Sequence, residues 1–144
     1  MLKIGVVGVG HLGQHHARKF MAMDNARLAG IYDAKASRAK EIAKTLGAYR
    51  FDSYSELLDA CDAVDIAATT TAHYELAKQA LTAGKHVFLE KPITSKLEEA
   101  YELLDIAEKN KLKIQVGHIE RFNPVIMKVE HEISEPMFIE STRI

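Results

Sequence analysis

Three glycines near the start of the chain have the spacing of a phosphate-binding loop. Gly8, Gly10 and Gly13 follow a short apolar run as G-x-G-x-x-G. In such a loop the first glycine allows a tight turn out of a strand, the second lets the backbone approach a pyrophosphate, and the third lets the next helix pack close to the sheet. The helix N-terminus then presents N–H groups to the anion. The spacing predicts that these glycines, with His11 and Leu12 between them, bind a dinucleotide.

An acidic residue stands where the ribose of that dinucleotide is expected. Asp33 follows Gly13 by twenty positions and ends a second apolar run over 28–32. A carboxylate there accepts hydrogen bonds from ribose hydroxyls and repels a 2′-phosphate, so the expected cofactor is NAD(H). Arg38 and Lys35 leave tolerance for NADP open, because a flexible cation can offset the carboxylate, and we count Arg38 with the cofactor site. The alternative for Asp33 is a solvated residue that ends a strand.

A lysine lies at the predicted sheet edge where open α/β proteins bind ligands. Glu90, Lys91 and Pro92 follow the strand-like run 86–89. Proline pushes the residue before it towards extended geometry, which gives Lys91 a defined direction. Beside a bound nicotinamide, a lysine can hydrogen-bond the ribose and the reacting hydroxyl. The alternative is a surface lysine after a strand.

The composition narrows the class of protein. With 144 residues, 47% of them hydrophobic, the chain suffices for one domain with a core and is too short for two full ones. A net charge of −1 without long charged blocks gives no indication of nucleic-acid or membrane binding. Cys61 is the single cysteine, which excludes an internal disulfide and favours a reducing cytoplasm. No apolar run approaches the roughly 18 to 20 residues of a membrane span.

Short β-branched runs alternate with segments of helical periodicity, which predicts βαβ units. We expect a Rossmann-type doubly wound parallel sheet. The predicted strands lie at 3–7, 28–32, 49–51, 63–68, 86–89 and 113–116, with a further one at 137–144. The predicted helices lie at 12–23, 37–46, 53–58, 71–84, 95–110 and 124–131.

Polar residues and glycines mark the ends of several predicted helices. Gly47 is expected as a left-handed terminator, and Asn123-Pro124 as a cap followed by proline at the first helical position. Thr71 is expected to cap the helix that follows it. Capping boxes are expected at Ser53 with Glu56 and at Ser95 with Glu98. The packed face of the helix at 95–110 is expected to comprise Leu97, Ala100, Tyr101, Leu104 and Ala107.

The last segment comes after a complete set of βαβ units. We therefore expect residues 1–124 to form the dinucleotide-binding domain, and residues 125–144 to be a connecting helix and the first strand of a second domain, with the chain truncated after it. The apolar residues of 137–144 predict self-association into a homo-oligomer through an open edge.

Three motifs together make the chain resemble the Gfo/Idh/MocA oxidoreductases. These are the glycine loop at 8–13, A-G-K-H-V-F-L-E-K-P at 83–92 and G-H-I-E-R-F-N-P at 117–124, and the resemblance spans essentially all 144 residues. It implies a nicotinamide-dinucleotide Rossmann domain followed by a larger α/β domain, and oxidation or reduction of hydroxyls of sugars, inositols and nucleotide sugars. The motif at 117–124 resembles the corresponding segment of the family branch that oxidises the 3-hydroxyl of UDP-N-acetylglucosamine.

The resemblance also implies roles for individual residues. Glu90 positions the nicotinamide, Lys91 contacts its ribose and the substrate as the catalytic residue, and Pro92 shapes the turn, in many members as a cis peptide. His73 matches the family's histidine after the fourth strand, and it is assigned to the cofactor site with Thr69 and Thr70. The usual Thr-Pro pair is here Thr70-Thr71, so this backbone is less rigid. The remaining acid/base residues of the family lie in the second domain, and the chain alone is expected to bind cofactor better than it turns over substrate.

Other reactive residues have plainer explanations. His11, His15 and His16 lack an acidic or cysteine partner that would favour a metal, so no metal site is expected. Tyr74 and Lys78 imitate a Y-x-x-x-K pair, but the glycine spacing differs from that of short-chain dehydrogenases. Cys61 is expected at a helix end or in the core.

Two residues after the strand at 113–116 fit two different roles. His118 and Arg121 lie at the ligand-facing end of the sheet, and Arg121 fits contact with a phosphate or carboxylate, or else a hinge between domains.

The leading hypothesis is the cofactor domain of an NAD-dependent sugar or nucleotide-sugar dehydrogenase. A non-catalytic NAD-binding sensor or regulatory module stays open as the alternative.

Overall fold

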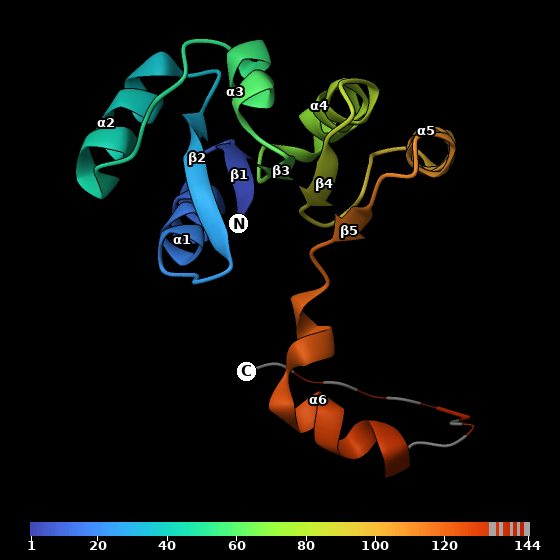
Figure 1. The fold of residues 1–144 in the computed structure, drawn as a ribbon. Helices are drawn as coiled ribbons and strands as arrows, with labels where there is room; N and C mark the ends of the chain where they lie inside the picture. Colours follow the sequence, from blue (N-terminus) through green and yellow to red (C-terminus); the bar gives the residue numbers. More distant parts are fainter. Residues whose placement is uncertain (133–134, 136, 139, 141, 143–144) are drawn as a thin grey trace.

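A parallel β-sheet forms the centre of the structure, a computed structural model that describes residues 1–132, 135, 137–138, 140 and 142 (Figure 1). Its strands are β1 (Leu2–Val7), β2 (Ala26–Tyr32), β3 (Ala63–Ile66), β4 (His86–Leu89) and β5 (Ile114–Val116). The α-helices are α1 (His11–Met21), α2 (Ala36–Leu46), α3 (Tyr54–Ala60), α4 (Thr70–Thr82), α5 (Leu97–Lys109) and α6 (Pro124–Val129). Two 3-10 turns, η1 (Ile119–Phe122) and η2 (Glu130–Glu132), flank α6.

The strand order creates a reversal next to β1. The five strands run in the order β2-β1-β3-β4-β5, and every neighbouring pair is parallel. The chain therefore moves outwards from β1 to β2, then crosses back to place β3 on the other side of β1. In open α/β folds this switch point, at the carboxyl ends of the strands, is where ligands bind.

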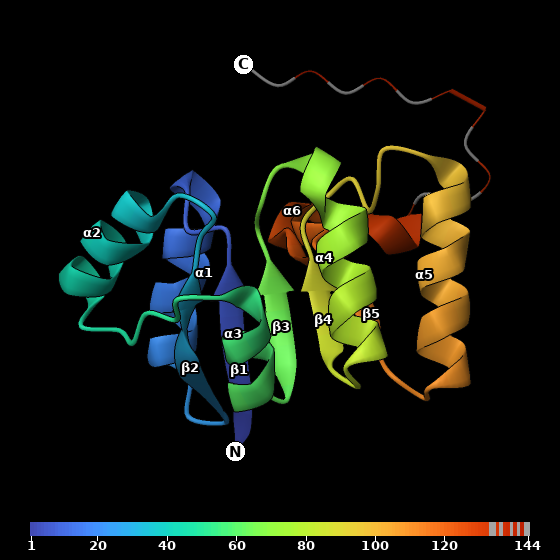
Figure 2. The same ribbon diagram turned by 90° about the horizontal axis from the view of Figure 1, so that it is seen from above.

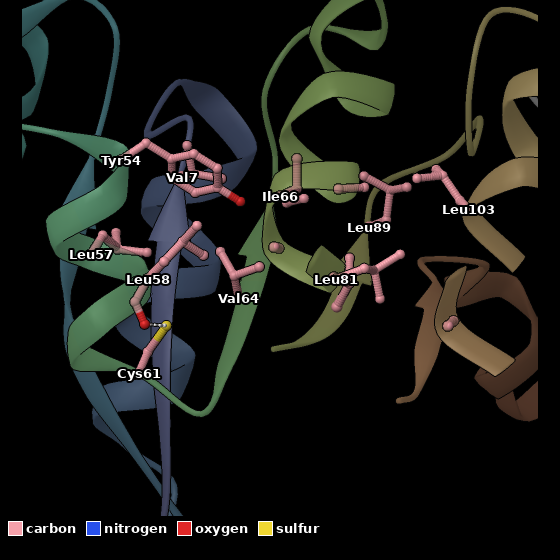
Figure 3. Close-up of a cluster of buried hydrophobic side chains, with 14 residues drawn as sticks. Val7, Tyr54, Leu57, Leu58, Cys61, Val64, Ile66, Leu81, Leu89 and Leu103 are labelled. Atoms are coloured by element: carbon pink, nitrogen blue, oxygen red, sulfur yellow. Dashed lines mark hydrogen bonds between the residues drawn. The ribbon is translucent and has the colours of Figure 1, made fainter. Parts of the chain in front are cut away.

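Helices cover both faces of the sheet, as the prediction of a doubly wound fold requires. Figure 2 shows α3, α4 and α5 in front of the strands and α1 behind them. The larger core cluster lies between the sheet and α3, α4 and α5, and it includes Leu57, Ile66, Leu89 and Leu103 (Figure 3). A smaller cluster, which includes Ala17 of α1 and Ile31 of β2, lies on the other face. Because both faces are covered, the strands read as continuous apolar runs.

Several predicted helix ends are confirmed. Gly47 ends α2 in the left-handed conformation with φ +65°. The Ser53 side chain accepts the N–H of Glu56, whose carboxylate in turn accepts the N–H of Ser53, so the capping box that starts α3 is complete. Asn123 caps α6, and Pro124 takes its first position.

Two predicted caps are wrong. The N-cap of α4 is Thr69, so Thr71 lies within the helix. The N-cap of α5 is Lys96, and Ser95 stands one residue too early to cap it. The physical reason for the second error is a local competitor, because the Thr94 hydroxyl donates to the Lys96 carbonyl and sets where the helix can begin.

The packed face of α5 is also partly wrong. Ala100, Leu103 and Ala107 are buried, whereas three expected members are exposed, at 65% for Leu97, 61% for Tyr101 and 46% for Leu104. Both sets have apolar residues at helical spacing. The sequence therefore does not determine which set packs against α4.

The predicted strand at 49–51 exists only as an isolated bridge between Arg50 and Ile31, which leaves five strands up to residue 116 where six were predicted. The predicted strand at 137–144 falls largely on residues outside the described ones, and the described Met137 and Phe138 belong to no strand. Within the described residues, no helix has the length and apolar character needed to cross a membrane.

Candidate dinucleotide site

A pocket of about 690 Å³ opens at the strand reversal. Its lining comes from the glycine loop after β1, the residues that end and follow β2, and the segment after β3, with further contributions from α3 and α4. The predicted site residues that line it are Gly8, Gly10, His11, Leu12, Asp33, Arg38 and Thr69. The fold thus brings together residues from three separate parts of the sequence at the edge where a ligand is expected.

The glycine loop leaves no room for side chains at two of its positions. Gly8 has φ +84°, and a Cβ there would lie 2.6 Å from the Cα of Ala68. A Cβ on Gly13 would lie 2.0 Å from the carbonyl oxygen of Gly8, so this glycine allows α1 to sit tightly against the loop. At Gly10 the neighbour of such a Cβ is Arg38 Nη1 at 3.9 Å, which leaves open space above the backbone.

That open space lies at the N-terminus of α1. Gly10 is the N-cap of the helix, and the first turn contains no acidic residue. The first N–H groups of a helix have no partner within it, and the helix dipole adds partial positive charge there. The site therefore fits a pyrophosphate in both space and charge.

Asp33 is buried, and backbone groups fix its carboxylate. Oδ2 accepts the N–H of Val9 at 3.0 Å, and Oδ1 accepts the N–H of Lys35 at 2.8 Å. The half-exposed guanidinium of Arg38 lies 3.4 Å from Oδ2. Each carboxylate oxygen can accept more than one hydrogen bond, so Asp33 keeps capacity for a ribose hydroxyl. A solvated end of a strand, the alternative reading of Asp33, does not describe this geometry.

Glu90, Lys91 and Pro92 lie beside the pocket rather than in its lining. They follow β4 at the same edge of the sheet, and the Lys91-Pro92 peptide is cis, as the resemblance implied. Glu90 is buried and its Oε2 accepts the N–H of Lys91 at 3.2 Å, while the Lys91 residue is exposed. The hydrogen bond to Glu90 therefore fixes the backbone of Lys91, and the Lys91 residue is exposed to solvent.

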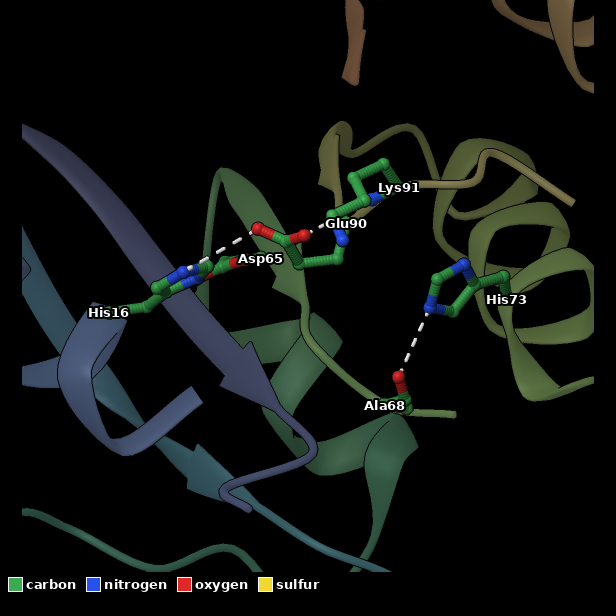
Figure 4. A network of polar contacts seen from close by, with 6 residues as sticks. All are labelled: His16, Asp65, Ala68, His73, Glu90 and Lys91. Carbon is green, nitrogen blue, oxygen red and sulfur yellow. Dashed lines mark hydrogen bonds and ion pairs between the residues drawn. The ribbon is translucent and has the colours of Figure 1, made fainter. Parts of the chain in front are cut away.

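His73 sits below two loops of the site. One ring nitrogen lies 2.9 Å from the carbonyl oxygen of Pro92. The other lies 3.1 Å from the carbonyl oxygen of Ala68 (Figure 4). The residue is only 1% exposed. This position joins the loop after β3 to the turn after β4, and Thr70 opens the helix that carries His73.

A second histidine, His16, lies beside the site and has the acidic partners that the sequence analysis did not expect for it. His16 Nδ1 lies 2.9 Å from Oδ2 of the fully buried Asp65, and its Nε2 lies 3.7 Å from Glu90 Oε1 (Figure 4). The hydrogen bond with Asp65 raises the pKa of His16, and burial raises the pKa of Asp65. The available signal was an aspartate in the middle of an apolar strand, because a buried charge requires a partner.

Arg121 is not brought to the pocket. It lies in η1 and lines a separate hollow with Ile126, Val129 and Glu130. His118 caps the start of the same turn and is exposed. A cofactor contact by Arg121 stays a prediction.

The remaining candidates have structural roles. Cys61 ends α3 and is buried, and this burial raises the pKa of its thiol. Tyr74 donates to Glu102 at 2.7 Å and Lys78 pairs with the same carboxylate, so the Y-x-x-x-K pair ties α4 to α5. Among the described residues, no group of three His, Cys, Asp or Glu side chains is placed to hold a metal ion.

The dinucleotide-binding α/β proteins share three features: a parallel sheet whose strand order reverses, a glycine loop at a helix N-terminus, and an acidic residue after the second strand. The structure has all three. Residues 2–118 match the Gfo/Idh/MocA family, described as "Oxidoreductase family, NAD-binding Rossmann fold". The chain belongs to this family, as its motifs predicted.

Individual relatives are dehydrogenases of sugars. UDP-N-acetylglucosamine 3-dehydrogenase of Acidithiobacillus ferrooxidans is 39% identical over 99% of this chain and 45% of its own length. Glucose-6-phosphate 3-dehydrogenase of Bacillus subtilis is 37% identical over 85% of this chain and 35% of its own length. A solved structure of the Acidithiobacillus enzyme, GnnA, superposes with a TM-score of 0.86 at 40% identity, covering 91% of this chain and 43% of that one. The chain thus spans less than half the length of these relatives.

Proposed function

We propose that this chain is the NAD(H)-binding domain of a dehydrogenase that acts on a hydroxyl-bearing carbon of a sugar or nucleotide sugar. The observation that carries the proposal is the pocket at the strand reversal, where Gly10, the first turn of α1 and Asp33 meet. Membership of an NAD-binding oxidoreductase family supports it.

The pocket suggests how the cofactor is held. The open space above Gly10 takes the pyrophosphate, and Asp33 accepts the hydroxyls of the adenosine ribose. The carboxylate disfavours a 2′-phosphate, so we propose NAD over NADP. Arg38 is the opposing influence, because its guanidinium borders the same pocket.

The bound nicotinamide supplies a hydride acceptor or donor. In our proposal Glu90 and Lys91 face it from the turn after β4. The Lys91 ammonium then donates to the substrate hydroxyl and orients it, and the buried Glu90 carboxylate fixes the backbone from which Lys91 projects.

The names of two relatives support the proposed substrate class. Both oxidise a 3-hydroxyl of a hexose derivative by their names, and this favours an enzyme over a sensor module. We propose UDP-N-acetylglucosamine as the particular substrate and the cytoplasm as the location. We assign residues 1–124 to the cofactor domain and residues 125–144 to the link into a substrate domain, and we propose that the protein self-associates.

Calorimetric titration with NADH and then NADPH tests the proposal. We expect NADH to bind more tightly than NADPH, and Asp33→Ala to weaken NADH binding. Absence of binding by either cofactor would overturn it. NADH formation from NAD and UDP-N-acetylglucosamine by the intact protein that includes the substrate domain, with free glucose and inositol as controls, then tests the substrate. Activity on the free sugar or inositol alone would contradict the nucleotide-sugar assignment, and sedimentation at rising concentration tests self-association.

A further inference from the structure

His16 contacts two carboxylates, those of Asp65 and Glu90, and Lys91 follows directly after Glu90 (Figure 4). His16 comes from α1, Asp65 comes from β3, and Glu90 follows β4, so three elements that border the site meet at one ring. Asp65 is fully buried, and the side chains of Glu90 and His16 are 9% and 22% exposed. Such a low exposure strengthens charge–charge interactions.

The geometry favours a doubly protonated ring. A neutral imidazole has one N–H, so it would turn a lone pair towards one of the two carboxylates. An imidazolium instead donates from Nδ1 to Asp65 at 2.9 Å and places positive charge 3.7 Å from Glu90. Asp65 depends on this donor, because within the described residues its other oxygen, Oδ1, is buried without a hydrogen-bond partner.

Two charged groups and one aromatic ring contact His16. Asp65 and Glu90 form ion pairs with it, and Phe88 of β4 meets the ring edge-on with centroids 6.0 Å apart. The hydrogen bond with Asp65, followed by the charges of Asp65 and Glu90, outweighs burial and raises the pKa of His16.

The Glu90 carboxylate is confined on three sides. His16 faces Oε1, the Lys91 N–H donates to Oε2, and a Cβ on Gly117 would lie 2.9 Å from Oε1. A change at His16 therefore reaches the backbone of Lys91 through a single side chain.

We propose that His16, as an imidazolium paired with Asp65, is a positioning residue for the nicotinamide end of the site: it holds Glu90, and through Glu90 the Lys91 turn. This inference rests on the proposed function, in which that turn faces the nicotinamide. It assigns His16 no contact with the cofactor itself.

The test compares NADH with ADP-ribose, which lacks the nicotinamide, in calorimetric titrations of the full chain. His16→Gln should weaken NADH binding about tenfold, because the Lys91 turn is then no longer held in position against the nicotinamide, and it should leave ADP-ribose binding unchanged. The preference of the wild type for NADH over ADP-ribose should also decline as pH rises through the titration of His16. His131→Gln, the same substitution in the exposed turn η2, should match the wild type in both respects.

The outcomes separate the two proposals. Failure of the wild type to bind either ligand would refute the proposed function. If the wild type binds both ligands, and His16→Gln loses affinity for both equally or for neither, only the positioning role of His16 is overturned. If His16→Gln does not fold, an NMR titration of the wild-type His16 ring decides: its pKa should change on addition of NADH but not of ADP-ribose, and an equal response to both would overturn the inference.

Discussion

The Asp33 carboxylate accepts the backbone N–H of Val9, a residue of the glycine loop twenty-four positions earlier, at a distance of 3.0 Å. The side chain proposed to bind the ribose thus also fixes the loop proposed to bind the pyrophosphate. The two parts of the proposed cofactor site are therefore structurally coupled, and a substitution at Asp33 acts on both.

Replacement of Asp33 by two different residues should separate these effects. Asp33→Ala leaves the N–H groups of Val9 and Lys35 without an acceptor, so the free energy of unfolding should fall by about 1–3 kcal/mol. Asp33→Asn keeps one acceptor oxygen and removes the charge, so it should be the more stable variant and should shift the affinity ratio from NADH towards NADPH about tenfold. Urea unfolding and calorimetry measure the two quantities. Asp105→Asn, on the exposed side of α5, is the control, and an unchanged ratio in Asp33→Asn would contradict the assignment.

Gly13→Ala should disrupt the glycine loop. Its Cβ would lie 2.0 Å from the Gly8 carbonyl oxygen, a backbone atom that cannot move aside freely. We expect a loss of about 1–3 kcal/mol in urea unfolding and strongly reduced NADH binding, because α1 must shift away from the pocket. Gly47→Asn is a matched control at a left-handed position with open space around it, and it should cost less than about 1 kcal/mol. Equal effects of the two substitutions would argue against close packing at Gly13.

The contrast between two adjacent leucines of α5 tests the observed core. Leu103 is fully buried and Leu104 is 46% exposed. Leu103→Ala should lower the free energy of unfolding by about 2–5 kcal/mol, and Leu104→Ala by less than about 1 kcal/mol. Urea unfolding of both variants provides the measurement. A larger loss for Leu104→Ala than for Leu103→Ala would instead support the packed face predicted from the sequence periodicity.

These leucines also show where sequence reasoning reached its limit. The alternation of runs predicted the parallel sheet and most helices, and the glycine spacing with Asp33 identified residues that the fold brings to one pocket. Local patterns failed on α5, where two sets of apolar residues have helical spacing. They also failed at its N-terminus, where the Thr94 hydroxyl donates to the Lys96 carbonyl. The pairing of His16 with Asp65 joins residues forty-nine positions apart, and only the order of the strands places them together.

Stability should depend on pH through His16. The hydrogen bond with Asp65 raises the pKa of the folded ring above its ordinary value of 6.5. The protonated ring is therefore bound more favourably in the folded state, and its contribution is fully present below pH 6.5 and lost as pH rises through the raised pKa. Urea unfolding across this range should show a decline in the wild type and in His131→Gln that is absent in His16→Gln. A parallel decline in all three proteins would assign it to other groups.

The pocket has one further consequence, for the order in which the protein is made. Every residue that lines it lies between Val7 and Gln79, whereas Glu90 and Lys91 come later. Synthesis proceeds from the N-terminus, so all groups that line the pocket proposed for the adenosine end leave the ribosome before the turn proposed to face the nicotinamide. A growing chain therefore acquires the parts proposed to retain the cofactor ahead of those proposed to put it to use.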